Sequence, residues 1–156
     1  YIDLPPTPRY PFGYGLTTSK VIYGAPTLDR REAKIGDTVM VRVPITNAGT
    51  RPVREVAQAY VRDLFASRAR PGRRLAAFRA VELAPGETKV VEMAIRPVDL
   101  GFHVETGHWV VEAGDFRVFV GADATASASV DFRLTDSLDV PARDEPVLCL
   151  DRVMAE

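Results

Sequence analysis

Few side chains in this sequence are of the types that carry out covalent chemistry, and they form no catalytic pattern. The 156 residues include two histidines, His103 and His108, and one cysteine, Cys149. Nucleophilic catalysis needs a nucleophile, a base and a group that orients the base. No Gly-x-Ser-x-Gly motif is present, and neither histidine is near Cys149 in sequence. We therefore expect no catalytic residue, and we interpret Cys149 as an inert thiol.

Metal binding and acid–base chemistry find equally little support. His103, Glu105 and His108 follow Asp99 closely, but no second motif completes a set of metal ligands. Hydrolysis of a glycosidic bond needs two carboxylates across a cleft. With 21 acidic residues, pairs are inevitable by chance and no pattern distinguishes one of them. We nominate no metal ligand and no catalytic carboxylate, and we expect no cofactor.

Two other features could bind a ligand. Trp109, the only tryptophan, is a candidate for stacking on a sugar of a β-glucan or an oligosaccharide, although a tryptophan in a β-sandwich is more often a core or rim residue. A cluster of arginines could bind carboxylates through guanidinium groups, but a solvated loop is the interpretation we favour. The cluster consists of Arg68, Arg70, Arg73, Arg74 and Arg79.

Composition excludes several classes of protein. A hydrophobic fraction of 46% argues against disorder, and a net charge of −1 provides no field to hold nucleic acid or an anionic membrane. No apolar run approaches the roughly 20 residues of a membrane span. We expect neither a nucleic-acid nor a membrane partner. A periplasmic or secreted location is favoured, and a cytoplasmic one stays open. The lack of an internal disulfide is compatible with all three locations. Since Tyr1 is not an initiator methionine, we expect a processed chain or a piece of a longer one.

The sequence predicts that these residues lie on short β-strands. Twelve prolines and eleven glycines interrupt runs rich in Val, Phe and Tyr, and no long segment has a helical period. The clearest strand is residues 38–47, whose alternate apolar positions are Val39, Val41, Val43 and Ile45. Pro44 occupies the outward phase and removes a hydrogen-bond donor, so we expect a bulge or an exposed edge there.

Further strands are expected at residues 55–63, 75–83, 89–95, 109–111, 116–120 and 130–134. The first of these should contact other residues on both faces, because neither of its phases is purely polar. Phe78, Val81 and Leu83 are the expected anchors of the second. Six or seven strands with this spacing favour an all-β fold, a two-sheet antiparallel β-sandwich of the immunoglobulin or fibronectin type III kind.

Three regions are expected along the chain. Residues 17–134 should form the sandwich, and residues 135–156 an acidic extension that either trails free or packs on a neighbour. Residues 1–16 contain four prolines among several aromatic side chains, which excludes a helix. We call this segment the strap, because an extended aromatic segment of this kind is expected to lie on another surface.

Five ordered blocks over residues 8–134 resemble the fibronectin type III-like domain at the C-terminus of glycoside hydrolase family 3 enzymes. PRYPFGYGL at 8–16 is similar to the family's P-x-YPFGYGLSYT, and VPITNAG at 43–49 is similar to V-T-V-T-N-T-G. EVAQAYVRD at 55–63 resembles E-V-V-Q-L-Y-V-R-D. The fourth block, at 70–87, ends in VELAPGE, and the fifth, at 99–118, joins an Asp-Leu pair to WVVEAGDFRV.

The resemblance implies a non-catalytic accessory domain of a retaining β-glycosidase, of the β-glucosidase or β-xylosidase type. In that family an aspartate nucleophile lies on a barrel domain and a glutamate acid/base on an α/β-sandwich domain, and no position here matches either motif. The accessory domain would pack on both catalytic domains, stabilise the parent enzyme and fence the approach of substrate. The candidate docking residues are Tyr10, Pro11, Phe12, Gly13 and Tyr14. The alternative is a stand-alone β-sandwich module that binds polysaccharide or protein.

Overall fold

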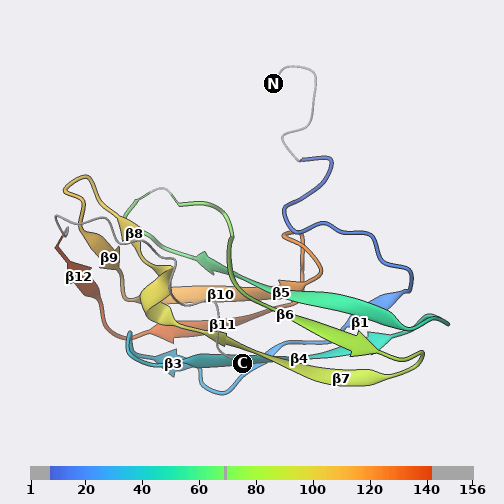
Figure 1. Cartoon of the computed structure of the whole chain (residues 1–156). Helices are drawn as coiled ribbons and strands as arrows, with labels where there is room; N and C mark the ends of the chain where they lie inside the picture. The colour runs from blue at the N-terminus through green and yellow to red at the C-terminus, as the bar shows by residue number, and fades with distance from the viewer. Residues whose placement is uncertain (1–7, 69, 142–156) are drawn as a thin grey trace.

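The computed structural model describes residues 8–68 and 70–141, and its regular elements are β-strands apart from one short 3-10 helix (Figure 1). In chain order they are β1 (Val21–Tyr23), β2 (Thr27–Leu28), β3 (Glu32–Ala33), β4 (Val39–Asn47), β5 (Val53–Asp63), β6 (Arg74–Leu83), β7 (Thr88–Ile95), η1 (Pro97–Leu100), β8 (Phe102–His103), β9 (Trp109–Val111), β10 (Gly114–Gly121), β11 (Ser129–Leu134) and β12 (Leu138–Val140).

Two sheets lie face to face in Figure 1. In the first sheet β4 is central, with β7 along one side and the short strands β1 and β2 along the other. The second sheet has the order β3-β11-β10-β5-β6. All pairs in both sheets are antiparallel except the two-residue pairing of β3 with β11, which is parallel. The expected two-sheet sandwich is therefore confirmed.

The core lies between the sheets and contains the alternate residues that the sequence indicated. Val39, Val41, Val43 and Ile45 of β4 are completely buried, and Phe116, Val118 and Val120 of β10 are nearly so. The rings of Phe116 and Phe132 stack with their centroids 5.4 Å apart. Burial of such side chains supplies roughly 1.5–3 kcal/mol each, which explains why the alternation fixes the two-layer arrangement.

Pro44 lies at an interruption in the neighbouring strand. β1 pairs with β4 as far as Ile45, and β2 pairs with it from Arg42. Between them the Gly24 N–H donates to the Pro44 carbonyl at 2.8 Å. The proline nitrogen, which has no hydrogen to donate, therefore faces the gap between β1 and β2. The expected edge-like site is present, and β4 has no bulge there.

The middle of β5 is covered on both faces, as the sequence predicted, whereas Val56 on its outer face is exposed. Ala57 and Ala59 face the core, and the outward residues Gln58 and Tyr60 are also buried. One expectation for β6 is wrong. Phe78 is 69% exposed and is not an anchor. It lies five residues before the buried Leu83, so its side chain points to the opposite, outward face of the strand.

The end of the sandwich carries a small third sheet with the order β12-β9-β8. β12 belongs to the expected extension, of which residues 135–141 are described. It pairs antiparallel with β9, so that Val140 is opposite Trp109. The rest of the extension, residues 142–156, and residues 1–7 of the strap lie outside the described residues. No helix in the described ranges is long and apolar enough to cross a membrane.

Candidate docking surface

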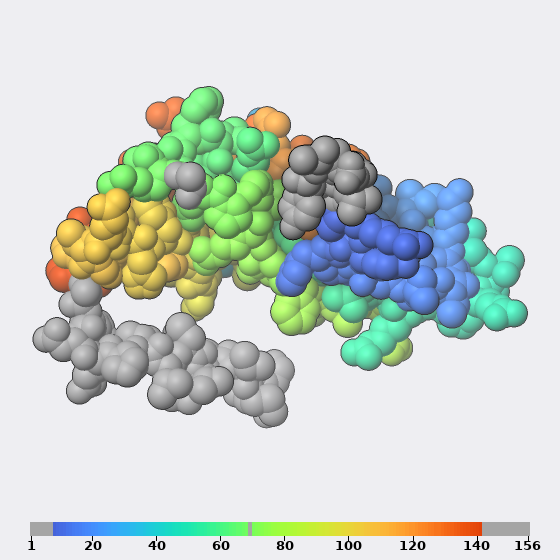
Figure 2. Space-filling view, turned by 90° about the horizontal axis from the view of Figure 1, so that it is seen from above, coloured from blue at the N-terminus to red at the C-terminus, as the bar shows by residue number. Residues whose placement is uncertain are grey.

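The described part of the strap exposes its aromatic rings. Tyr10, Phe12 and Tyr14 are 63%, 69% and 48% exposed, and Pro11 is half-buried. The rings of Tyr10 and Tyr14 lie 5.2 Å apart, because a turn closed by the Tyr14 N–H and the Pro11 carbonyl brings them together. Figure 2 shows this segment in dark blue against the upper surface of the sandwich.

The backbone of the strap is held by two side chains of β5. The Gln58 amide nitrogen donates to the Gly13 carbonyl at 3.1 Å and to the Ala122 carbonyl. The Gln58 carbonyl oxygen accepts from the Tyr60 hydroxyl at 2.5 Å. The Tyr60 hydroxyl oxygen also lies 3.2 Å from the Phe12 carbonyl oxygen. All the hydrogen-bonding groups of the Gln58 side chain are thus used, which orders the strap before any partner binds.

Gly13 is required at the point of closest approach. Its φ of +81° lies in the left-handed region, which disfavours other residues. A Cβ at this position would lie 2.1 Å from the Gln58 carbonyl oxygen and 2.5 Å from the Tyr60 hydroxyl. The glycine therefore lets the strap backbone reach the buried pair.

A loop after β10 completes the support. The Ala124 N–H donates to the Phe12 carbonyl at 2.9 Å. Arg73 holds this loop by donating to the carbonyls of Ala124 and Ala126, both at 2.6 Å, while its guanidinium lies 3.7 Å from the centre of the Phe119 ring. Burial lowers the pKa of Arg73, and the nearby positive charge of Arg62 adds to this effect.

Other members of the arginine cluster also bind groups within the chain. Arg70 forms an ion pair with Asp63 at 2.8 Å, with both side chains largely buried, and donates to the Leu100 carbonyl. Arg74 donates to the Gly101 carbonyl at 2.9 Å. These guanidinium groups therefore fasten η1 and the following residue to β5 and β6. The favoured interpretation of a solvated loop therefore does not hold for Arg70, whose side chain is largely buried, whereas Arg74 is exposed.

Trp109 is packed rather than presented as a flat platform. Its indole N–H donates to the Val98 carbonyl at 3.1 Å, and Gly101 lies against its ring. The ring of His103 lies edge-on to it, with centroids 5.0 Å apart. This half-buried position favours the rim interpretation of Trp109.

Two carboxylates lie deep in the described part of the chain, both on β5. Glu55 accepts from the Tyr23 hydroxyl at 2.7 Å, and this bond joins the two sheets. Burial raises the pKa of Tyr23 strongly, and its hydrogen bond to Glu55 raises the pKa further. Asp63 is eight residues further on, about 26 Å away at ~3.3 Å per residue. A retaining glycosidase needs its two carboxyl groups about 5–5.5 Å apart, so these two cannot form such a pair.

The remaining candidates for chemistry are not brought together. His108 contacts Asp139 at 2.8 Å, whereas the other histidine contacts the Gly107 carbonyl at 3.1 Å. Over residues 8–68 and 70–141 no group of three or more His, Cys, Asp or Glu residues could hold a metal ion. Cys149 lies outside the described residues.

Sequence reasoning identified the strap but missed the residues that hold it. Gln58 and Tyr60 stood out only as polar and aromatic residues on a strand phase that should otherwise face water. That signal predicted a contact on the outer face of β5 but did not identify the partner.

Comparison with known proteins agrees with this architecture. The model of the fibronectin type III-like domain family matches residues 55–124. A β-xylosidase of Formosa agariphila is 39% identical over 120 residues, which are 77% of this chain and 17% of that protein. A periplasmic β-glucosidase of Salmonella typhimurium is 37% identical over 139 residues, which are 86% of this chain and 18% of that protein.

Solved structures show the same likeness. The β-glucosidase EmGH1 of Erythrobacter marinus superposes with a TM-score of 0.79 at 36% identity, over 86% of this chain and 18% of that one. A β-glucosidase of Listeria innocua in complex with glucose gives 0.78 at 34% identity, over the same shares. The chain spans less than a fifth of the length of these relatives. It belongs to the fibronectin type III-like domains of glycoside hydrolase family 3 enzymes.

Proposed function

We propose that the chain is a non-catalytic accessory domain of a retaining β-glycosidase, and that it docks through its strap on the catalytic domains of the parent enzyme. The observation that carries the proposal is that the strap contacts the sandwich mainly through its backbone and leaves its aromatic side chains exposed. Its backbone is fixed to the sandwich by Gln58, Tyr60 and Ala124, whereas the side chains of Tyr10, Phe12 and Tyr14 stay largely exposed, the Phe12 ring meeting the sandwich only edge-on at Tyr60. Rigid, exposed aromatic rings are typical of a surface that another protein covers.

The size of the effect can be worked out from the exposed fractions. Complete burial of an aromatic side chain is worth roughly 1.5–3 kcal/mol. The three residues are exposed by about 60% on average, so together they would supply on the order of 4 kcal/mol. The proposal that the chain is not itself catalytic is supported by the wide separation of Glu55 and Asp63. A parent that cleaves β-glucosides or β-xylosides is in keeping with the relatives.

The test is thermal unfolding of the full-length parent enzyme with Tyr10, Phe12 and Tyr14 all replaced by Ser. Docking predicts a lower unfolding temperature and faster thermal inactivation, with catalytic constants below that temperature unchanged. Val90→Ser is the matched control, since Val90 is 62% exposed on the opposite sheet. An unfolding temperature equal to that of the control would overturn docking through the strap.

The alternative, a polysaccharide-binding module, is tested with the isolated 156-residue chain. It predicts that soluble β-glucans change the fluorescence of Trp109 and that insoluble β-glucan retains the chain. Since Trp109 is already packed against Gly101 and His103, we expect neither effect. Saturable binding abolished by Trp109→Ala would favour the alternative instead.

A further inference from the structure

A second apolar surface lies beside the strap, on the outer face of β5 and β6. The register places Gln58 opposite Phe78, and Val56 opposite Ala80. Opposite residues of an antiparallel pair have their Cβ atoms roughly 4.5–5.5 Å apart on the same face. Because Gln58 binds the Gly13 carbonyl, Phe78 shares the face of the sheet on which the strap lies.

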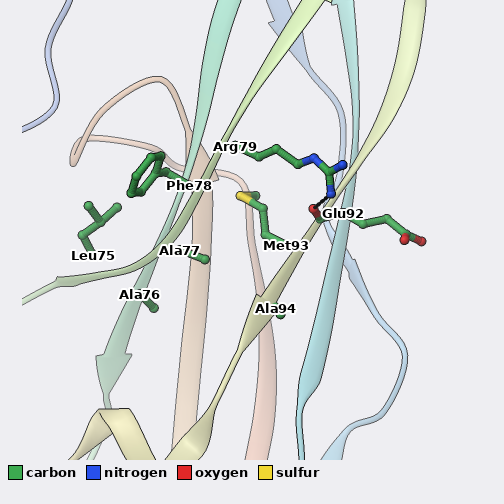
Figure 3. Close-up of a pocket in the computed structure, with 8 residues that line it drawn as sticks. All are labelled: Leu75, Ala76, Ala77, Phe78, Arg79, Glu92, Met93 and Ala94. Atoms are coloured by element: carbon green, nitrogen blue, oxygen red, sulfur yellow. Dashed lines mark hydrogen bonds between the residues drawn. The ribbon is translucent and has the colours of Figure 1, made fainter. Parts of the chain in front are cut away.

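A β-bulge enlarges this surface. The register of β5 and β6 shifts between Ala59 and Tyr60, which are opposite Ala77 and Leu75 respectively, so that Ala76 has no partner. The extra residue reverses the alternation of β6, and Leu75 therefore shares the outer face with Phe78. Figure 3 shows these two side chains next to each other on one side of β6.

The surface is uncharged and exposed. Phe78 is 69% exposed and Val56 is 42% exposed, Ala80 is also exposed, and Leu75 is half-buried. Exposed apolar side chains grouped on one face of a sheet, in addition to the three rings of the strap, are typical of a surface that another protein covers.

We propose that Val56, Leu75, Phe78 and Ala80 form, with the strap, one continuous docking surface for the catalytic part of the parent enzyme. This inference rests on the proposed function and extends it from the strap to the sheet. The catalytic part is the expected occupant, because the chain spans only 17% of the β-xylosidase of Formosa agariphila and 18% of the β-glucosidase of Salmonella typhimurium. A covalently attached neighbour is present at a high effective concentration beside this face.

The partner should pack on the face of the sheet and not add a strand to its edge. At the open edge between β6 and β7, Lys89 donates to the Glu82 carbonyl at 2.8 Å, and Arg79 donates to the Glu92 carbonyl (Figure 3). Cationic side chains that bind edge carbonyls in this way discourage pairing with another strand. The contact with the partner is therefore made by side chains.

The test measures how fast a thiol reagent reaches the proposed surface. Phe78→Cys, in a background with Cys149→Ser, is labelled with a maleimide in the 156-residue chain and in the full-length parent, and the modified peptide is quantified by mass spectrometry. Docking predicts that labelling is slowed about tenfold or more in the parent, since access then requires local opening of the interface. Val90→Cys, on the opposite sheet, should be labelled at the same rate in both proteins.

A strap variant, Phe12→Cys, separates this inference from the proposed function. Protection of both positions in the parent supports both. Protection of Phe12→Cys but not of Phe78→Cys would overturn the extended surface and leave docking through the strap standing. Equal labelling of both variants in the parent and in the chain would overturn both. Circular dichroism of each variant confirms that the sandwich is folded before labelling.

Discussion

Replacing Gln58 with Glu should release the strap, because the exchange keeps the shape of the side chain and removes its two donors. The amide nitrogen of Gln58 donates to the carbonyls of Gly13 and Ala122, and a carboxylate would place an acceptor against both. Two lost hydrogen bonds at about 1 kcal/mol each, together with buried acceptors left unpaired, amount to about 2–4 kcal/mol. Detachment of the strap limits the loss, since it returns the carboxylate to water.

The penalty should depend on pH in a defined direction. A buried carboxyl that faces two carbonyls has a pKa raised above the ordinary ~4.3 of glutamate. When folding raises the pKa of an acid, the destabilisation is complete at neutral pH and declines as the pH falls through the raised value. The protonated acid regains one donor, so Gln58→Glu should recover part of its stability near pH 4.

The assay is urea unfolding of the 156-residue chain at pH 7.5 and pH 4.5, with amide hydrogen exchange of the strap measured in parallel. Exchange of the Tyr14 N–H, which donates to the Pro11 carbonyl at 3.0 Å, reports whether the strap remains ordered. Ala80→Glu is the matched control, because it adds the same charge to an exposed position on the same face. Equal losses in the two variants, or a loss independent of pH, would refute the reasoning.

Three further predictions concern the described contacts. Gly13→Ala should lower the free energy of unfolding by about 1–3 kcal/mol because of its positive φ and crowded Cβ, whereas Gly15→Ala, with open space around it, should change it by less than about 0.5 kcal/mol in the same urea titration. Asp63→Asn should cost about 3 kcal/mol by leaving a buried guanidinium uncompensated, and Asp131→Asn, in an exposed ion pair, less than about 1 kcal/mol; comparable losses would contradict the role of burial. Burial raises the pKa of Tyr23 above its usual value, so the stability contributed by the Tyr23 hydroxyl is complete below about pH 10 and is lost as the pH rises further. Tyr23→Phe should therefore make the fall in unfolding free energy above pH 10 less steep. Identical slopes for the two proteins would contradict this prediction.

The two-layer fold could be predicted from the order of residues alone. Val39, Val41, Val43 and Ile45 alternate so regularly that only a strand buried on one face satisfies them, and residues 116–120 and 130–134 repeat the pattern. Pro85 and Gly86 also favour a turn by their residue types, and between β6 and β7 Gly86 adopts a φ of +76°. Such local signals need no knowledge of distant residues.

What covers each outward face could be learned only from the folded chain. Tyr60 and Phe78 are both aromatic residues on outward phases, but Tyr60 is buried beneath the strap and Phe78 is exposed. The bulge at Ala76, the binding of loop carbonyls by Arg73 and the direction of the strap rings likewise had no local signal. These features escape prediction because alternation with a period of two assigns a side chain only to a face of its sheet. What lies over that face depends on contacts between segments that are far apart in the chain, such as Gln58 with Gly13, 45 residues away.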